Sequence, residues 1–294
     1  MTPLHTLLAA TDLSQSARQA VIRAAMIAQD SGASLALLHV IENRGLPQLR
    51  DLFGEASSAL TERLENDIRT ELDMLAAEIG EPLGISVGQH LRSGNVLEEI
   101  CNVADAMDTS LMVLGAHGAG FIRQILLGIT AERLLRRALR PLLVVRRPAT
   151  AAYRQVIVAV DFSAGSHTAI QFARAVAPQA SLTLFHAFEI PFESRLRFAA
   201  VEESVLDQHR LKARQHATGE VNHVAAAAGL DAGDYHSLIA HGNAGLRLVE
   251  AERQLGADLI VVCKHGVSMT DELLLGSVTR HVLAEASCDV LVVR

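Results

Sequence analysis

Short apolar runs recur along the chain with little alternation between apolar and polar positions. They lie in LLAATDL (residues 7–13), LALLHVIE (35–42), SLMVLGAHG (110–118) and PLLVVR (141–146). A strand that is buried on both faces has this pattern, because neither side of it meets water. The segments between the runs are longer and carry apolar residues at helical spacing, such as Ala17, Ala20, Val21 and Ala24. This order predicts parallel sheets covered by helices on both faces.

The whole pattern occurs twice. VIVAVDF (156–162), LTLFHAFE (182–189), DLIVVCKHG (258–266) and DVLVVR (289–294) repeat the four segments at an offset near 148 residues. A repeat of this length indicates a duplicated domain. We therefore predict an α/β protein of two tandem doubly wound domains, each a five-stranded parallel sheet with helices on both faces. The predicted domains are residues 1–148 and 153–294, joined by a short linker.

Composition narrows the class of protein. The 294 residues suit two domains of about 150 residues each. No apolar run reaches the 18 to 20 residues, roughly, that cross a bilayer, and the first residues lack the pattern of a signal peptide, so we expect a cytoplasmic protein. The net charge is −7, with 14 basic and 17 acidic residues up to Thr150 and 12 and 16 after it. Neither half therefore resembles a nucleic-acid or membrane binder.

Ligands of doubly wound domains bind beyond the carboxyl ends of the strands, where the strand order reverses. In the first copy, Gly115 and Gly118 follow the fourth predicted strand, and Gly128 precedes the last predicted helix. Glycine lets backbone N–H groups approach phosphate oxygens closely, and the amino end of a helix favours an anion. The nine residues between Gly118 and Gly128 are enough to wrap around a polyphosphate.

These glycines, the first-strand Asp12 and the closing LLVVR resemble the universal stress protein family, and the resemblance covers both copies. Nucleotide-binding members of that family carry Gly-x2-Gly-x9-Gly-(Ser/Thr). The resemblance implies that ATP binds, with or without Mg²⁺. It also implies that Asp12 contacts the ribose and that the backbone of Val40 bonds to adenine. Ile129 departs from the pattern, so Thr130 is the candidate for the hydroxyl usually found one residue earlier.

The second copy keeps Asp161, Gly266, Gly276 and Ser277, but Cys263 stands in place of the first glycine. Asp271 and Glu272 lie inside the loop, where negative charge repels phosphates. We therefore expect ATP to bind mainly in the first copy. Single-domain members of the family resemble dimers joined through their last strands, so we also expect PLLVVR and DVLVVR to meet in an intramolecular pseudo-dimer.

Other chemistries find less support in the sequence. GxxxxGK[ST] is absent, and no GxGxxG follows the first predicted strand, which argues against a P-loop ATPase or a dehydrogenase. Cys263 and His265, near His241, are potential soft metal ligands without a repeated spacing, so we expect no metal site. His39 and His186 end equivalent strands, and we expect them to pack or hydrogen-bond at the sheet edge.

The sequence thus predicts a cytoplasmic, non-catalytic stress-response protein that binds ATP and responds to it as a regulatory or interaction module. Its partners are nucleotide and unidentified proteins, with no nucleic acid or membrane, and a homodimer of the tandem chain is compatible with this reading. One alternative is an interaction scaffold that binds no nucleotide. Another is a slow ATPase, although no catalytic residue can be named from spacing alone.

Overall fold

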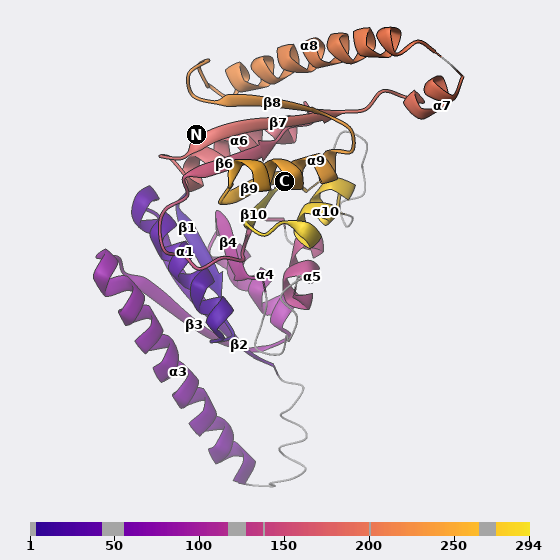
Figure 1. Ribbon diagram of the computed structural model, residues 1–294. Helices are drawn as coiled ribbons and strands as arrows, with labels where there is room; N and C mark the ends of the chain where they lie inside the picture. The colour runs from indigo at the N-terminus through magenta and orange to yellow at the C-terminus, as the bar shows by residue number, and fades with distance from the viewer. Residues whose placement is uncertain (1–3, 43–55, 117–127, 138, 200, 265–274) are drawn as a thin grey trace. The chain divides into compact units, whose positions relative to one another are not determined.

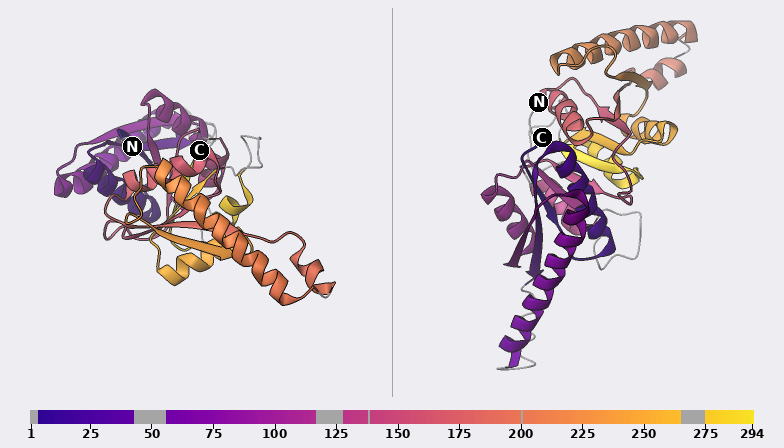
Figure 2. Two further views of the ribbon diagram at one scale, coloured as in Figure 1. Left: turned by 90° about the horizontal axis from the view of Figure 1, so that it is seen from above. Right: turned by 90° about the vertical axis from the view of Figure 1, so that its left-hand side faces the viewer.

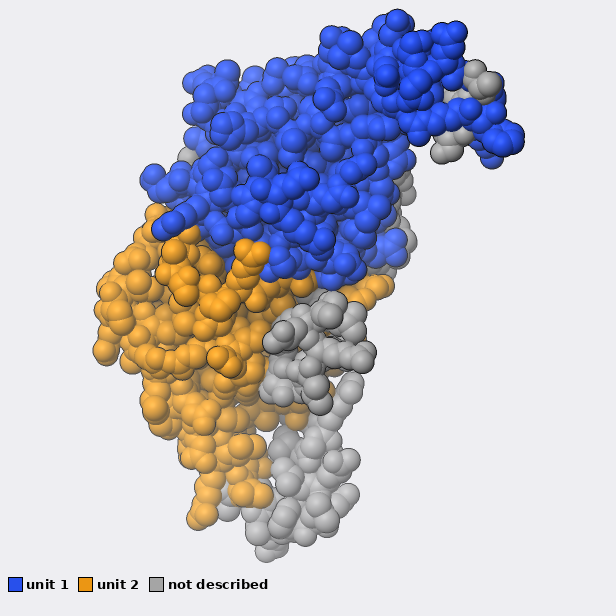
Figure 3. Space-filling model, viewed as in Figure 1, with its two compact units in different colours: residues 1–2, 153–294 blue, residues 3–152 orange. Residues whose placement is uncertain are grey.

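The two copies form separate compact units, the N-terminal domain (residues 3–152) and the C-terminal domain (residues 153–294), coloured orange and blue in Figure 3. The computed structural model describes residues 4–42, 56–116, 128–137, 139–199, 201–264 and 275–294. No helix in these stretches is both long and apolar enough to cross a membrane.

The N-terminal domain alternates strands and helices (Figure 1). Its elements are β1 (Thr6–Ala10), α1 (Gln15–Ser31), β2 (Ser34–Glu42), α3 (Ala56–Leu83), β3 (Val87–Gly94), α4 (Val96–Ala106), β4 (Leu111–Gly115), α5 (Ile129–Arg137) and β5 (Leu142–Val145). The strands lie in the order β3-β2-β1-β4-β5, and every neighbouring pair is parallel. The strand order reverses between β1 and β4, which creates a crevice at their carboxyl ends.

The C-terminal domain repeats this plan. Its elements are β6 (Gln155–Ala159), α6 (Ala164–Val176), β7 (Ser181–Phe188), α7 (Glu193–Phe198), α8 (Glu203–Ala227), β8 (His236–His241), α9 (Ala244–Leu255), β9 (Leu259–Cys263), α10 (Ser277–Glu285) and β10 (Asp289–Val293). The order is β8-β7-β6-β9-β10, again parallel throughout. The predicted fold class, two tandem α/β domains with five-stranded parallel sheets, is confirmed. The pseudo-dimer arrangement stays a prediction.

Helices cover both faces of each sheet. In the N-terminal domain α1 packs against α3 and α4 packs against α5, and in the C-terminal domain the pairs are α6 with α8 and α9 with α10. The central strands are apolar on both faces, and Leu7, Leu37, Val113 and Leu143 are fully buried. Figure 2 shows that the long helix α3 runs past the strands that it covers. The unbroken apolar runs therefore reflect strands enclosed between two helical layers.

Local sequence sets the boundaries of several helices. The Ser14 hydroxyl accepts a hydrogen bond from Ala17 N and caps α1, while Asn95 and Asn243 cap α4 and α9 in the same manner. Gly32 and Gly256 end α1 and α9 in the left-handed conformation. Side-chain oxygens at the start and glycine at the end satisfy backbone groups that a helix leaves unpaired.

A buried carboxylate joins α9 of the C-terminal domain to the residues just before its last strand. Glu252 on α9 is 1% exposed, and its Oε1 accepts hydrogen bonds from Ser287 N, Ser287 Oγ and Cys288 N at 2.6–3.1 Å. These donors lie just before β10. Ala104 occupies the equivalent position in the N-terminal domain, so this connection belongs to the second copy.

Candidate functional site

The first strand of each domain ends in a sharp turn that carries the predicted aspartate. Leu13 and Phe162, the residues after Asp12 and Asp161, have φ angles of 64° and 65°. A left-handed conformation costs a residue with a side chain roughly 1–2 kcal/mol. Both domains keep this strained turn, which directs the chain from the strand into the next helix and leaves the aspartate at the crevice.

The two aspartates are held differently. Asp12 is exposed, and its Oδ1 accepts a hydrogen bond from Ser14 N at 3.1 Å. Asp161 is half-buried, and its Oδ1 accepts hydrogen bonds from Ser163 N, Ser163 Oγ and Ser166 Oγ at 3.0, 2.6 and 2.9 Å. The equivalent of Ser166 in the first copy is Ala17, which has no hydroxyl.

The second strand of each domain extends past the first and leaves part of its backbone edge uncovered. Thr11 N donates to Leu38 O, and Val160 N donates to Phe185 O. Residues two apart in a strand face the same neighbour. Val40 and Ala187 therefore turn their N–H and C=O groups towards the crevice, where β1 and β6 have already ended.

The strand-end histidines have structural partners. His39 Nδ1 lies 2.9 Å from Thr11 O, and His186 Nδ1 lies 2.8 Å from Val160 O. Because a carbonyl only accepts, Nδ1 carries the proton in both rings. His186 also stacks on Phe162 with ring centroids 4.2 Å apart. The prediction that these histidines hydrogen-bond at the sheet edge is confirmed.

The glycine loops of both domains have the same closed base. Gly128 N donates to Ala116 O at 2.8 Å, and Gly276 N donates to Lys264 O at 2.9 Å. Gly118 and Gly266 lie outside the described residues, as does His265. The structure thus shows where each predicted loop leaves and rejoins its domain, and the matching bond places Gly128 and Gly276 at equivalent positions.

The helix after each loop begins at the crevice. The first helical bonds run from Glu132 N to Gly128 O and from Arg280 N to Gly276 O. The amides of the first three residues of α5 and α10 precede these bonds and point out of the helix, as at any amino end. Thr130 and Ser277 lie in these first turns and are exposed. A positive dipole end and outward N–H groups form an anion-binding arrangement.

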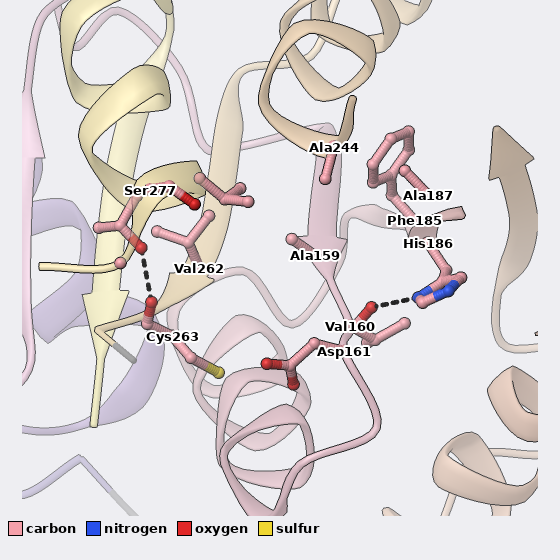
Figure 4. Close-up of a pocket in the computed structure, with 13 residues that line it drawn as sticks. Ala159, Val160, Asp161, Phe185, His186, Ala187, Ala244, Val262, Cys263 and Ser277 are labelled. Atoms are coloured by element: carbon pink, nitrogen blue, oxygen red, sulfur yellow. Dashed lines mark hydrogen bonds between the residues drawn. The ribbon is translucent and has the colours of Figure 1, made fainter. Parts of the chain in front are cut away.

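In the C-terminal domain these parts line one pocket of about 160 Å³ (Figure 4). Asp161, Ala187, Cys263, Gly276 and Ser277 all contribute to its wall. A neighbouring hollow of about 390 Å³ shares Ala187, Ala244, Ser277 and Val278 with it and adds Glu189, Asn243 and His281. The two hollows adjoin. Taken together, their volume lies within the range of small-ligand sites, which is roughly 300–1,000 Å³.

The glycine at the end of the fourth strand has a packing role. A Cβ added to Gly115 would lie 2.8–2.9 Å from the hydroxyl, carbonyl carbon and carbonyl oxygen of Ser16 on α1. In the second copy the small residue is on the helix, because a Cβ added to Gly165 would lie 3.0 Å from Cys263 Sγ. In the first copy the strand therefore carries the small residue, Gly115, and the helix carries the larger one, Ser16. In the second copy the strand carries the larger residue, Cys263, and the helix carries Gly165. The Cys263 side chain lies against α6.

The environment of Cys263 makes its thiol unreactive. Burial, with a smaller contribution from the nearby Asp161 carboxylate, raises the pKa of Cys263 to about 12. Only the thiolate is nucleophilic. We expect Cys263 to resist iodoacetamide at pH 8 in the folded protein and to react readily in urea, as measured by peptide mass spectrometry. Modification in the folded protein at the rate of the urea-unfolded thiol would contradict this expectation.

Three features of the site were not predicted from the sequence. The first is the backbone of Ala187, which required the strand register. The second is the close approach of α10 to α9, where a Cβ on Gly245 would lie 2.9 Å from the His281 ring. The third is Ser166. A polar residue at a helical position that faces the core is the feature of the sequence that could have indicated it.

A model of the universal stress protein family matches residues 3–146 and again residues 152–294. The chain belongs to the universal stress protein family. The predicted resemblance to a tandem member is therefore confirmed, and the protein is a stress-response protein of this family.

Individual universal stress proteins agree with the match. One from Methanocaldococcus jannaschii is 26% identical over 150 residues, covering 47% of this chain and 91% of the relative. A homologue of universal stress protein A from Coxiella burnetii is 32% identical over 130 residues, covering 44% and 87%. The crystal structure of a universal stress protein from Archaeoglobus fulgidus is 20% identical and has a TM-score of 0.69, covering 100% of this chain and 99% of the other. It shows the shared fold.

Proposed function

We propose that the protein binds an adenine nucleotide, ATP in the first instance, at the carboxyl edge of its sheets and uses occupancy of these sites as a regulatory signal. One observation carries the proposal. In the C-terminal domain, an open strand edge, a carboxylate and the amino end of a helix converge on the same pocket (Figure 4). Each supplies what a different part of a nucleotide needs.

The parts of the site match the parts of ATP in order. The backbone of Ala187, or of Val40 in the N-terminal domain, offers one donor and one acceptor to the edge of adenine. Asp161 or Asp12 accepts hydrogen bonds from ribose hydroxyls. The first amides of α10 or α5, with the glycines of the preceding loop, receive the phosphates. Ser277 and Thr130 add hydroxyl donors there.

Binding rather than catalysis is the function that these residues support. In the described part of the chain, no group of three His, Cys, Asp or Glu side chains is placed to hold a metal ion. The output is a change in contacts with protein partners in the cytoplasm, or between copies of the tandem chain. The metal alternative at Cys263 and His265 includes a residue that is not described.

Retained nucleotide tests the proposal. We expect ATP or ADP in the supernatant after the purified protein is denatured, and binding of ATP in calorimetric titration of the nucleotide-free chain. The double variant Asp12→Asn with Asp161→Asn should bind more weakly, because an amide accepts ribose hydroxyls less strongly than a carboxylate. Absence of binding to the wild-type chain would favour the scaffold alternative.

We expect ATP turnover far below the typical enzyme range of about 1–10³ s⁻¹. The physical reason is that the described residues that line the two hollows include no arginine or lysine to balance charge on the phosphates. Release of inorganic phosphate from saturating ATP measures the rate. Turnover within the enzyme range that is lost in the double variant would instead place the protein among ATPases.

A further inference from the structure

The strand-end carboxylates of the two domains have the same backbone setting and different side-chain support. The turns match, since the residues after Asp12 and Asp161 have φ angles within 1° of each other, 64° and 65°. One difference in sequence lies on the following helix, where α6 carries Ser166 and α1 carries Ala17. The duplicated chain therefore compares a carboxylate with and without this hydroxyl.

Ser166 is fully buried and bonds twice to the same residue. Its Oγ donates to Asp161 Oδ1 at 2.9 Å and accepts from Asp161 N at 3.0 Å. One hydroxyl thus ties the carboxylate to the backbone of its own residue. A buried hydroxyl with both functions satisfied has no low-energy alternative orientation, because turning it leaves a buried group unpaired.

Ser163 completes the support. In the N-terminal domain the equivalent Ser14 caps α1, whereas Ser163 makes no cap bond and donates its hydroxyl to Asp161 Oδ1 at 2.6 Å. Three donors therefore converge on Oδ1 and fix the carboxylate plane. Figure 4 shows Asp161 at the pocket wall, between the end of β6 and Cys263. The second carboxylate oxygen, Oδ2, lies in the same fixed plane and is the oxygen available to accept hydrogen bonds from a ligand.

We infer that Ser166 is a positioning residue that preorganises Asp161 and makes the C-terminal pocket the tighter and more ribose-selective nucleotide site of the chain. The inference rests on the proposed function. A fixed acceptor loses less conformational entropy on binding than the exposed Asp12. The glycine pattern predicts tighter ATP binding in the first copy, and this inference predicts tighter binding in the second. The Cys263 side chain packs against Gly165. It is therefore no reason for weaker binding in the second copy.

The ligand class follows from the acceptor. Oδ2 recognises a neighbouring pair of hydroxyls, as on a ribose, and gains little from a sugar without them. ATP and 2′,3′-dideoxy-ATP share the base and the phosphates and differ at this contact alone. Their ratio of dissociation constants therefore reports the Asp161 contact, while general damage to the pocket weakens both.

The experiment titrates both nucleotides into the full chain carrying Asp12→Asn, which leaves the C-terminal carboxylate in place. We expect Ser166→Ala to weaken ATP about tenfold and to leave 2′,3′-dideoxy-ATP nearly unchanged, since hydrogen bonds to charged groups are among the stronger ones. Equal weakening of both nucleotides, or no weakening of ATP, would overturn the role of Ser166. Absence of ATP binding to the unmodified chain would instead overturn the proposed function.

The reciprocal variant gives an independent test that does not depend on the stability of the C-terminal domain. Ala17→Ser, in a chain carrying Asp161→Asn, places the same hydroxyl beneath Asp12. We expect it to raise the preference for ATP over 2′,3′-dideoxy-ATP severalfold relative to Asp161→Asn alone. An unchanged preference in a folded Ala17→Ser chain, verified by circular dichroism, would contradict the inference even if Ser166→Ala failed to fold.

Discussion

Replacing Glu252 with alanine is expected to lower the free energy of unfolding of the C-terminal domain by about 3 kcal/mol. The carboxylate is 1% exposed and accepts three hydrogen bonds from Ser287 and Cys288. Its removal leaves the buried amide of Cys288, and the amide of the neighbouring Ser287, without their acceptor. Urea denaturation followed by circular dichroism measures the loss.

Glu250→Ala is the matched control for this prediction. Glu250 lies on the same helix and forms an exposed ion pair with Arg247 at 2.7 Å. Exposed pairs contribute about 0–1 kcal/mol, so the unfolding midpoint should hardly move. A similar decrease in the free energy of unfolding for both variants would show that α9 is destabilised by the loss of any glutamate. It would contradict a particular contribution from the buried hydrogen bonds of Glu252.

The second large effect is expected at the end of β4, where Gly115→Ala should destabilise the N-terminal domain by about 2 kcal/mol. The added Cβ would meet Ser16, including its backbone, at 2.8–2.9 Å, and the backbone of α1 moves only with the whole helix. Gly219→Ala in α8 is the control, because a Cβ there has no neighbour within 4 Å. Urea denaturation compares the two, and equal stability of both variants would contradict the packing role of Gly115.

The exchange of sizes between the copies allows a sharper version of this test. Gly165→Ser should destabilise the C-terminal domain, because its Cβ would lie 3.0 Å from Cys263 Sγ. Adding Cys263→Gly removes that sulfur and should restore most of the loss. A double variant that is no more stable than Gly165→Ser would show that the two positions are independent.

Most of the fold was predictable, since buried strands and helical periodicity leave a direct trace in the order of residue types. The repeat of VIVAVDF after LLAATDL was enough to indicate two domains of the same plan. The length and position of α3 were harder to predict from the sequence, because a charged helix that runs past its sheet has a weak apolar pattern. The predicted glycine loops fall largely outside the described residues, so the roles of Gly118 and Gly266 stay predictions.

The candidate site shows what a single sequence hides. The change from Gly115 to Cys263 is visible in an alignment of the two copies and suggested obstruction of the phosphate space. The alignment also shows the compensating change, from Ser16 in the first copy to Gly165 in the second. Nothing in the spacing, however, indicates that residues about 100 positions apart are in contact. Residue types report burial and periodicity, whereas pairwise contacts such as Ser166 with Asp161 depend on how the turn after the strand directs its side chains.

Fusion of the two copies in one polypeptide has a consequence for signalling. Two identical subunits carry every substitution in both sites, so their pockets share one intrinsic affinity. The tandem chain escapes this constraint, and Ser166 at the position equivalent to Ala17 shows that its copies have diverged beside the strand-end aspartate. Under the proposed function, unequal pockets take the protein from empty through singly occupied to full as the nucleotide concentration rises. On the same proposal, a single chain distinguishes three ranges of nucleotide concentration, whereas a symmetric pair with independent sites reports one threshold.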